Sequence, residues 1–127
     1  MQARSIRVTL LLLLTGVLCL VLVASALAWR APTRSEQQAI TRVAERAPHA
    51  KRAHVHVSDI RVSTVGPWAD ATVTLYFGNA PDNATDILHR VHGKWINASL
   101  GTAGEWCVMP TKDQRNLGFS AGYPCHR

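Results

Sequence analysis

The chain is 127 residues long, and 47% of them are hydrophobic against 17% charged. An apolar N-terminal segment, residues 1–28, is followed by enough chain for one compact domain and too little for two. With 14 Lys and Arg against 8 Asp and Glu, the chain carries a net charge of +6. Its basic residues are not interleaved with aromatic ones, and this argues against a nucleic-acid-binding protein.

The N-terminal segment has the pattern of a targeting sequence. Arg4 and Arg7 precede an uncharged apolar run over residues 8–28, which reaches the roughly 20 residues that a membrane-spanning helix needs. Ala26 and Ala28 each complete a small-x-small sequence that a signal peptidase accepts. We therefore predict a domain outside the cytoplasm, either anchored in the cell membrane or secreted after cleavage near Ala26 or Ala28. The length of the run favours the anchor.

A short connector, residues 29–32, leads into the first predicted element of the domain. Thr33 and Glu36 have the spacing of a capping box, in which each side chain bonds the backbone N–H of the other residue. Apolar residues then recur with the period of one helical face; they are Ala39, Ile40, Val43, Ala44 and Ala47. The pattern predicts one amphipathic helix over residues 34–47, because Pro48 ends it.

After this helix the apolar period changes to two, which is typical of strands. Residues 55–62 alternate, with a change of parity near Ser58 and Asp59 that predicts a β-bulge. Residues 69–77 alternate most cleanly and predict a second strand with one buried and one wetter face.

The connections between strands carry turn residues. Gly66-Pro67 predicts a turn before the second strand, and residues 78–83 have the composition of a loop. Residues 86–92 and 95–100 predict two further strands, joined by a tight turn at His92, Gly93 and Lys94.

The C-terminal tail is predicted to be short and braced. Trp106 and Cys107 continue the last strand, and a short helix lies between Pro110 and Gly118. The order of one helix, about four antiparallel strands and a tail predicts a single α+β domain over residues 33–127, with the helix packed on the sheet.

Two cysteines, Cys107 and Cys125, lie outside the apolar segment. In a small exported domain an even number of cysteines indicates a disulfide, which stabilises a loop of this size by about 3 kcal/mol. The neighbouring sequence has no zinc-binding spacing and no partner for a nucleophilic cysteine beyond His126. We predict a disulfide, no metal and no cofactor.

Residues 59–65, 88–90 and 93–95 resemble, in spacing and composition, small exported proteins of actinobacteria whose role is unassigned. Together with the helix-then-sheet order, the domain resembles cystatin-like and NTF2-like domains. That resemblance implies one helix wrapped by a curled antiparallel sheet. It implies no activity, because the chain lacks the Gln-x-Val-x-Gly hairpin of cystatin inhibitors and is shorter than most NTF2-like enzymes.

Histidines are the first candidates for metal or catalytic chemistry. His54 and His56 share one strand face, whereas His89 and His92 have opposite parity and point to opposite faces. We interpret the four as surface residues rather than as a metal site.

Carboxylates are the second candidates. Asp70 with Asp59 or Glu105 is the kind of acid pair that a hydrolase uses. Because Asp70 occupies the polar side of its strand, we interpret it as part of a solvated face.

Aromatic and basic residues indicate a binding surface instead. Trp95 is predicted to close the core, whereas Trp68 follows a turn and is predicted to be partly exposed, beside Tyr76. The basic stretch around the helix would face an envelope protein or an anionic cell-wall or lipid surface. The candidate partner surface comprises Trp68, Tyr76, Arg42, Arg46, Lys51 and Arg52.

The leading functional hypothesis is a non-enzymatic exported or membrane-tethered module that binds a protein or another envelope component. A small secreted hydrolase is the first alternative, and it requires histidines 54, 56 and 89 to meet Asp70 in one pocket. A secreted protease inhibitor is the second, and it requires a rigid protruding loop at residues 107–110.

Overall fold

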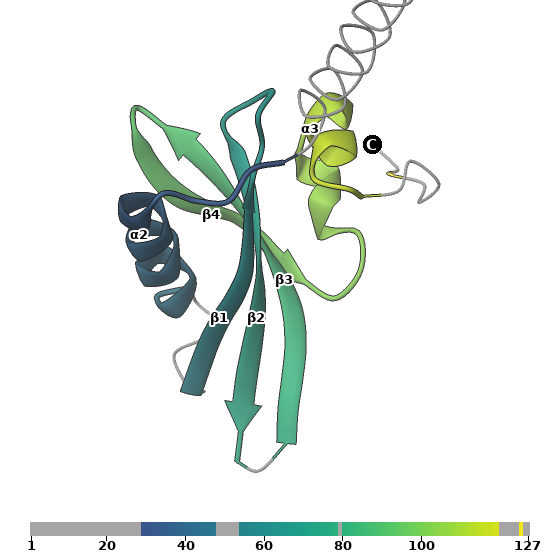
Figure 1. Ribbon diagram of the computed structural model, residues 1–127. Coiled ribbons are helices and arrows are strands. Elements are labelled where there is room, and N and C mark those ends of the chain that lie inside the picture. Colours follow the sequence, from purple (N-terminus) through teal and green to yellow (C-terminus); the bar gives the residue numbers. More distant parts are fainter. Residues whose placement is uncertain (1–28, 48–53, 79, 120–124, 126–127) are drawn as a thin grey trace, which may run out of the picture.

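The computed structural model describes residues 29–47, 54–78, 80–119 and 125. In chain order its elements are α2 (Arg34–Glu45), β1 (His54–Val62), β2 (Trp68–Phe77), β3 (Ala80–Val91), β4 (Lys94–Gly101), the 3-10 helix η2 (Glu105–Val108) and α3 (Thr111–Asn116). The strands form one antiparallel sheet in the order β1-β2-β3-β4. Figure 1 shows α2 on one side of this sheet and α3 on the other, so the predicted α+β class is confirmed.

The predicted membrane segment, residues 8–28, lies outside the described residues. Within the part of the chain that the structure describes, no helix is both long and apolar enough to cross a membrane.

Helix α2 begins at the predicted capping box. The Thr33 Oγ1 atom accepts a hydrogen bond from the Glu36 backbone N–H at 3.3 Å. The Glu36 carboxylate accepts one from the Thr33 N–H at 2.9 Å. The helix ends at Glu45, two residues earlier than predicted, because Arg46 and Ala47 bond carbonyls three residues back and tighten the last turn.

The predicted β-bulge and the predicted tight turn are both present. The β1–β2 register shifts between Ser58 and Arg61. Between β3 and β4, Val91 pairs with Lys94, and the two intervening residues, His92 and Gly93, have φ angles of 48° and 78°. Positive φ at both central positions is the geometry that two-residue hairpins favour, since it matches the twist of the strands.

The prediction of a loop at residues 78–83 is wrong. Strand β3 begins at Ala80, which pairs with Phe77 across a short hairpin, and Pro81 lies within the strand opposite Tyr76. Strand β4 pairs with β3 only from Thr85 onward. The first part of β3 is therefore an edge, where a sheet tolerates proline.

The chain after β4 also differs from the prediction. Trp106 and Cys107 do not continue the strand but lie in η2, because Gly104, with a φ of 81°, turns the chain out of the extended conformation. The predicted short helix is present as α3, which starts after Pro110 and stops before Gly118. Cys107 and Cys125 form a disulfide with their Cα atoms 5.4 Å apart.

Hydrophobic clusters form on both faces of the sheet because successive strand residues point to opposite sides. On the α2 face the buried residues are Ile40, Ala44, Val62, Ala69, Ala71, Val73, Leu75, Leu88 and Trp95. On the other face Ile87 packs with Met109 and Leu117 of the C-terminal segment. Trp95 thus closes the main core, as predicted.

Removing the helix cap has a moderate expected effect. Thr33→Ala should lower the free energy of unfolding by about 1 kcal/mol, because it leaves a backbone donor of the first turn without its acceptor. The matched control is Gln38→Ala on the exposed face of the same helix, which should change it by only a few tenths of a kcal/mol. Denaturant unfolding of both variants measures the difference, and equal effects would contradict the role of the cap.

Candidate functional site

Burial separates the acidic from the basic side chains of this domain. All Asp and Glu of the chain belong to the described residues, and four of them are buried: Asp70, Asp86, Glu105 and Asp113. Only Glu45, Asp59 and Asp82 are exposed. Eight basic residues are exposed: Arg30, Arg34, Arg42, Arg46, Arg90, Lys94, Lys112 and Arg115. The described surface is therefore more cationic than the composition indicates.

Two of the buried carboxylates have partners that the fold supplies from distant positions. Asp70 forms an ion pair with Arg61 across β1 and β2, with Arg61 Nε 3.0 Å from Asp70 Oδ1. Burial raises the pKa of Asp70, and the Arg61 guanidinium acts in the opposite direction. Asp113 of α3 accepts a hydrogen bond of 2.7 Å from Ser63 Oγ, which holds α3 against the turn between β1 and β2.

A third buried carboxylate, Asp86, lies on the α2 face of β3. Its cross-strand neighbours are Ala71 and Leu100, and Asn97 Nδ2 donates a hydrogen bond to its Oδ1 atom. Its Oδ2 atom has no hydrogen-bond partner among the described residues. Desolvation raises the pKa of Asp86 to about 7, so the carboxyl is half-protonated near neutral pH.

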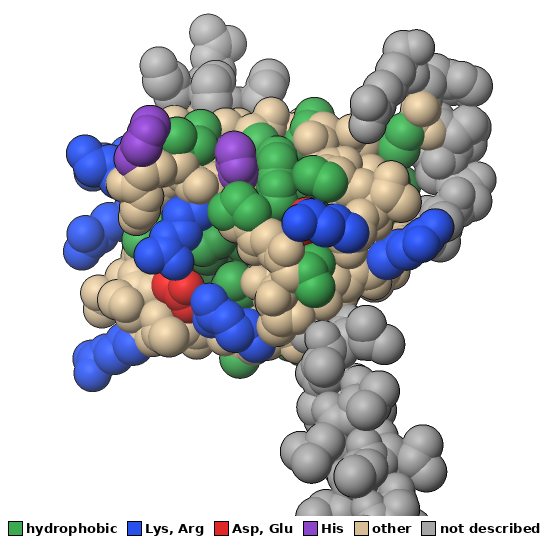
Figure 2. Space-filling model, turned by 90° about the horizontal axis from the view of Figure 1, so that it is seen from above, with side chains coloured by type: hydrophobic (Ala, Val, Ile, Leu, Met, Phe, Trp, Pro, Cys, Tyr) green, Lys and Arg blue, Asp and Glu red, His purple; other side chains and the backbone are tan. Residues whose placement is uncertain are grey.

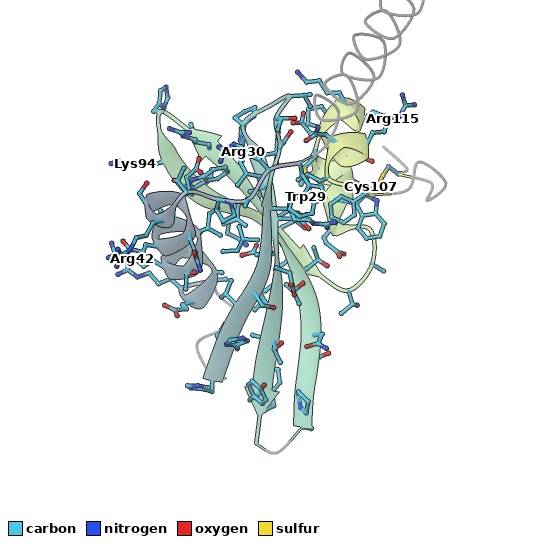
Figure 3. All side chains as sticks on the ribbon, in the orientation of Figure 1. Trp29, Arg30, Arg42, Lys94, Cys107 and Arg115 are labelled. Atoms are coloured by element: carbon cyan, nitrogen blue, oxygen red, sulfur yellow. A yellow bond between two sulfur atoms is a disulfide. The ribbon has the colours of Figure 1, made fainter. Side chains whose placement is uncertain are left out.

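Six of the exposed basic residues gather at one end of the molecule, which we call the cationic end: Arg30, Arg34, Arg90, Lys94, Lys112 and Arg115. It is formed by the β3–β4 hairpin and α3, which lie at the top of Figure 1, and by the start of α2, just below the hairpin. Figure 2 looks down on this end and shows blue side chains spread across it with little red between them. In Figure 3, Arg30, Lys94 and Arg115 lie toward this end, whereas Arg42 lies lower on the flank.

Glu36, an acidic side chain at the cationic end, is paired with arginine. The two Glu36 oxygens accept hydrogen bonds of 2.7 and 2.8 Å from the Arg30 guanidinium. Arg90 Nη1 lies 3.8 Å from Glu36 Oε1, which also accepts from Arg30. Hydrogen bonding from Arg30 lowers the pKa of Glu36 to about 2, so Glu36 stays ionised and paired at neutral pH. The other basic side chains of the cationic end are Arg34, Lys94, Lys112 and Arg115. They can attract phosphate or carboxylate groups, which Arg binds with two donors at once.

A shallow hollow along the solvent side of α2 extends this cationic surface. It is lined by Arg34, Gln37, Gln38, Thr41 and Arg42. Amide and hydroxyl groups between two guanidinium groups suit an anion with several oxygens. The hollow runs from the cationic end toward the flank.

The four histidines do not converge. His54 pairs with Tyr76 and His56 with Thr74 near one end of β2, whereas His89 pairs with Trp68 at its other end. His92 lies in the β3–β4 turn. Among the described residues, no group of three or more His, Cys, Asp or Glu is arranged to hold a metal ion.

The interpretation of Asp70 as solvated is wrong. Only 3% of the residue is exposed, because the C-terminal segment covers this part of the sheet. The centroid of the Phe119 ring lies 5.4 Å from the guanidinium carbon of Arg61, the partner of Asp70. The structure pairs Asp70 with Arg61 rather than with Asp59 or Glu105.

Residues of the predicted partner surface lie on different faces. Trp68 is half-buried, and its ring stacks on His89 with centroids 4.1 Å apart. Tyr76 is 39% exposed at the opposite end of β2. Arg42 and Arg46 are exposed on α2. Lys51 and Arg52 lie outside the described residues.

Residues 107–110, the segment that an inhibitor would present, are partly packed: Val108 is 49% exposed, whereas its neighbour Met109 is buried. Cys107 and Val108 belong to η2, and Met109 is only 2% exposed. Met109 packs with Ile87 and Leu117 beneath the C-terminal segment.

No protein family, curated protein or solved structure matches this chain. The resemblance to cystatin-like and NTF2-like domains therefore rests on the helix-on-sheet arrangement alone.

Proposed function

We propose that this protein is a non-enzymatic module of the cell envelope, exported through residues 8–28, that binds an anionic component through its cationic surface. The apolar run and its preceding arginines support export. The disulfide between Cys107 and Cys125 supports an oxidising compartment, since such bonds are rare in reducing ones.

One observation carries the proposed binding. The exposed side chains of the described residues include eight Lys and Arg but only three Asp and Glu, because the other carboxylates are buried or paired with arginine. Such a surface attracts anions over a Debye length, which is about 8 Å at physiological ionic strength.

Location is tested by the intact mass of the protein recovered from its host's membrane and medium, before and after reduction and thiol blocking. We expect the full-length mass in the membrane, with two thiols that become accessible only on reduction. A mass that begins near Leu27 or Trp29, found only in the medium, would contradict a retained tether while leaving export intact.

Binding is tested with the full chain in a neutral detergent, applied to immobilised polyglycerol phosphate as the anionic probe. We expect retention at low salt and release as the Debye length falls to about 3 Å at 1 M salt. Replacing Arg34, Lys94, Lys112 and Arg115 with Gln should abolish most of the retention. Retention that is insensitive to salt, or unchanged in this variant, would contradict the proposal.

A further inference from the structure

The connector before α2 is docked onto the sheet. The Arg30 backbone N–H bonds the Val62 carbonyl at 2.9 Å, and the Val62 N–H bonds the Arg30 carbonyl at 2.9 Å. The Arg30 side chain is fixed in turn by Glu36. The chain is therefore held against the sheet at Arg30, which is two residues after Ala28, the last residue of the apolar run.

This short distance places the cationic end at a membrane surface if the apolar run is in the membrane. Two residues of extended chain span about 7 Å, which is comparable to the Debye length at physiological salt. Figure 1 shows the described chain starting beside α3 and crossing the top of the sheet to α2. If the apolar run is in the membrane, the two residues between Ala28 and Arg30 keep Arg30 and the start of α2 close to the lipid headgroups.

The same end carries side chains suited to the interface between lipid and water. Trp29 directly follows the apolar run and is 45% exposed, and tryptophan is enriched at headgroup level. Val65, in the turn between β1 and β2, is 38% exposed. Two of the three exposed carboxylates, Glu45 and Asp82, belong to the last turn of α2 and the start of β3, away from this end. The third, Asp59, lies in β1 and lines a hollow together with Trp29.

We infer that the cationic end lies flat on anionic lipid headgroups of the bilayer that holds residues 8–28, with α2, the β3–β4 hairpin and α3 meeting the surface together. The inference rests on the proposed function and narrows it, because the anionic component becomes the phospholipid beside the tether. The β2–β3 hairpin then points away from the membrane.

The test uses the full chain with Cys19→Ala, reconstituted in vesicles of phosphatidylcholine alone or mixed with phosphatidylglycerol. An environment-sensitive fluorophore is attached at Val65→Cys, in the cationic end, or at Ala80→Cys, in the far hairpin. We expect lipids that carry a headgroup quencher to quench the label at position 65 in the mixed vesicles, with a blue shift that high salt removes. The label at position 80 should show no quenching and no blue shift in either kind of vesicle.

Two charge variants of equal size provide the matched control. Lys94→Glu should clearly weaken the response at position 65, whereas Arg46→Glu, at the far end of α2 and outside the hollow, should leave it unchanged. Thermal unfolding confirms that both variants fold. Equal quenching at position 65 in neutral and mixed vesicles, or equal loss in both variants, would overturn the inference.

Failure of this inference is distinguishable from failure of the proposed function. A tethered chain that is retained on polyglycerol phosphate but shows no response at position 65 would overturn the lipid contact alone, in favour of a wall polymer. A chain found only in the medium, without its apolar run, would overturn this inference, which needs the tether, and would leave the proposed export and anion binding standing.

Discussion

Stability of this protein should fall as pH rises from about 4 to about 7, and Asp86→Asn should remove most of that fall. The carboxyl of Asp86 is 0% exposed and desolvation raises its pKa to about 7, whereas an unfolded aspartate titrates near 3.9. Within this window the folded state holds a proton that the unfolded state has released. The free energy of unfolding therefore decreases with pH, by at most about 4 kcal/mol in total.

Glu36 changes the free energy of unfolding with pH in the opposite direction to Asp86, and it does so over a separate pH range. Arg30 lowers the pKa of Glu36 to about 2, so its stabilisation is complete above the normal glutamate pKa of about 4.3 and is lost as pH falls toward 2. Asp86 and Glu36 together should therefore contribute most to the free energy of unfolding near pH 4 to 5, rather than at neutral pH.

Denaturant unfolding of the full chain in a neutral detergent at a series of pH values measures this effect. Asp86→Asn should be clearly more stable than the wild type at pH 8 and similar to it at pH 4. The matched control is Asp82→Asn, an exposed carboxylate on the same strand, which should leave the pH profile unchanged. If the free energy of unfolding of the wild type stays constant between pH 4 and 7, Asp86 does not hold its proton in the folded state, which would contradict the prediction.

Loss of the disulfide is expected to lower the free energy of unfolding by about 3 kcal/mol, because the bond restricts the unfolded chain over a separation of 18 residues. The double variant Cys107→Ala with Cys125→Ala avoids leaving a free thiol. Amide hydrogen exchange should accelerate most in η2 and α3, which depend on the packing of Met109 and Leu117.

Two controls make the disulfide prediction specific. A reductant should destabilise the wild type by the same amount and have no effect on the double variant. Cys19→Ala, in the apolar run, should leave stability unchanged. Faster exchange spread evenly over the sheet would indicate that the bond supports the whole fold rather than its C-terminal segment.

Local signals predicted most of the helix and strand pattern correctly. The capping box of Thr33 and Glu36, the parity change near Ser58 and the positive-φ turn at Gly93 are each decided by a few neighbouring residues. The prediction for residues 78–83 was wrong because their composition, Pro81 included, favours a loop. Only the pairing of β3 shows that Pro81 lies in a part of the strand that forms an edge of the sheet.

The burial of the acids could not be predicted from alternation. A period of two separates the faces of a strand, but it does not say which face is covered, and here α2 covers one face while the C-terminal segment covers part of the other. Asp70 and Asp86 are consequently both buried, on opposite faces. Their partners, Arg61 and Asn97, come from neighbouring strands.

By itself the sequence determined the apolar run, the excess of basic residues, the cysteine pair and the order of one helix before an antiparallel sheet, because these depend on composition and short-range periodicity. Tertiary structure alone decided where the charges act. It buried or paired five of the carboxylates, brought Arg30, Lys94 and Arg115 toward one end from separate parts of the chain, and docked the connector at Arg30 onto Val62. Such an arrangement depends on contacts between residues far apart in the chain, which no local pattern encodes.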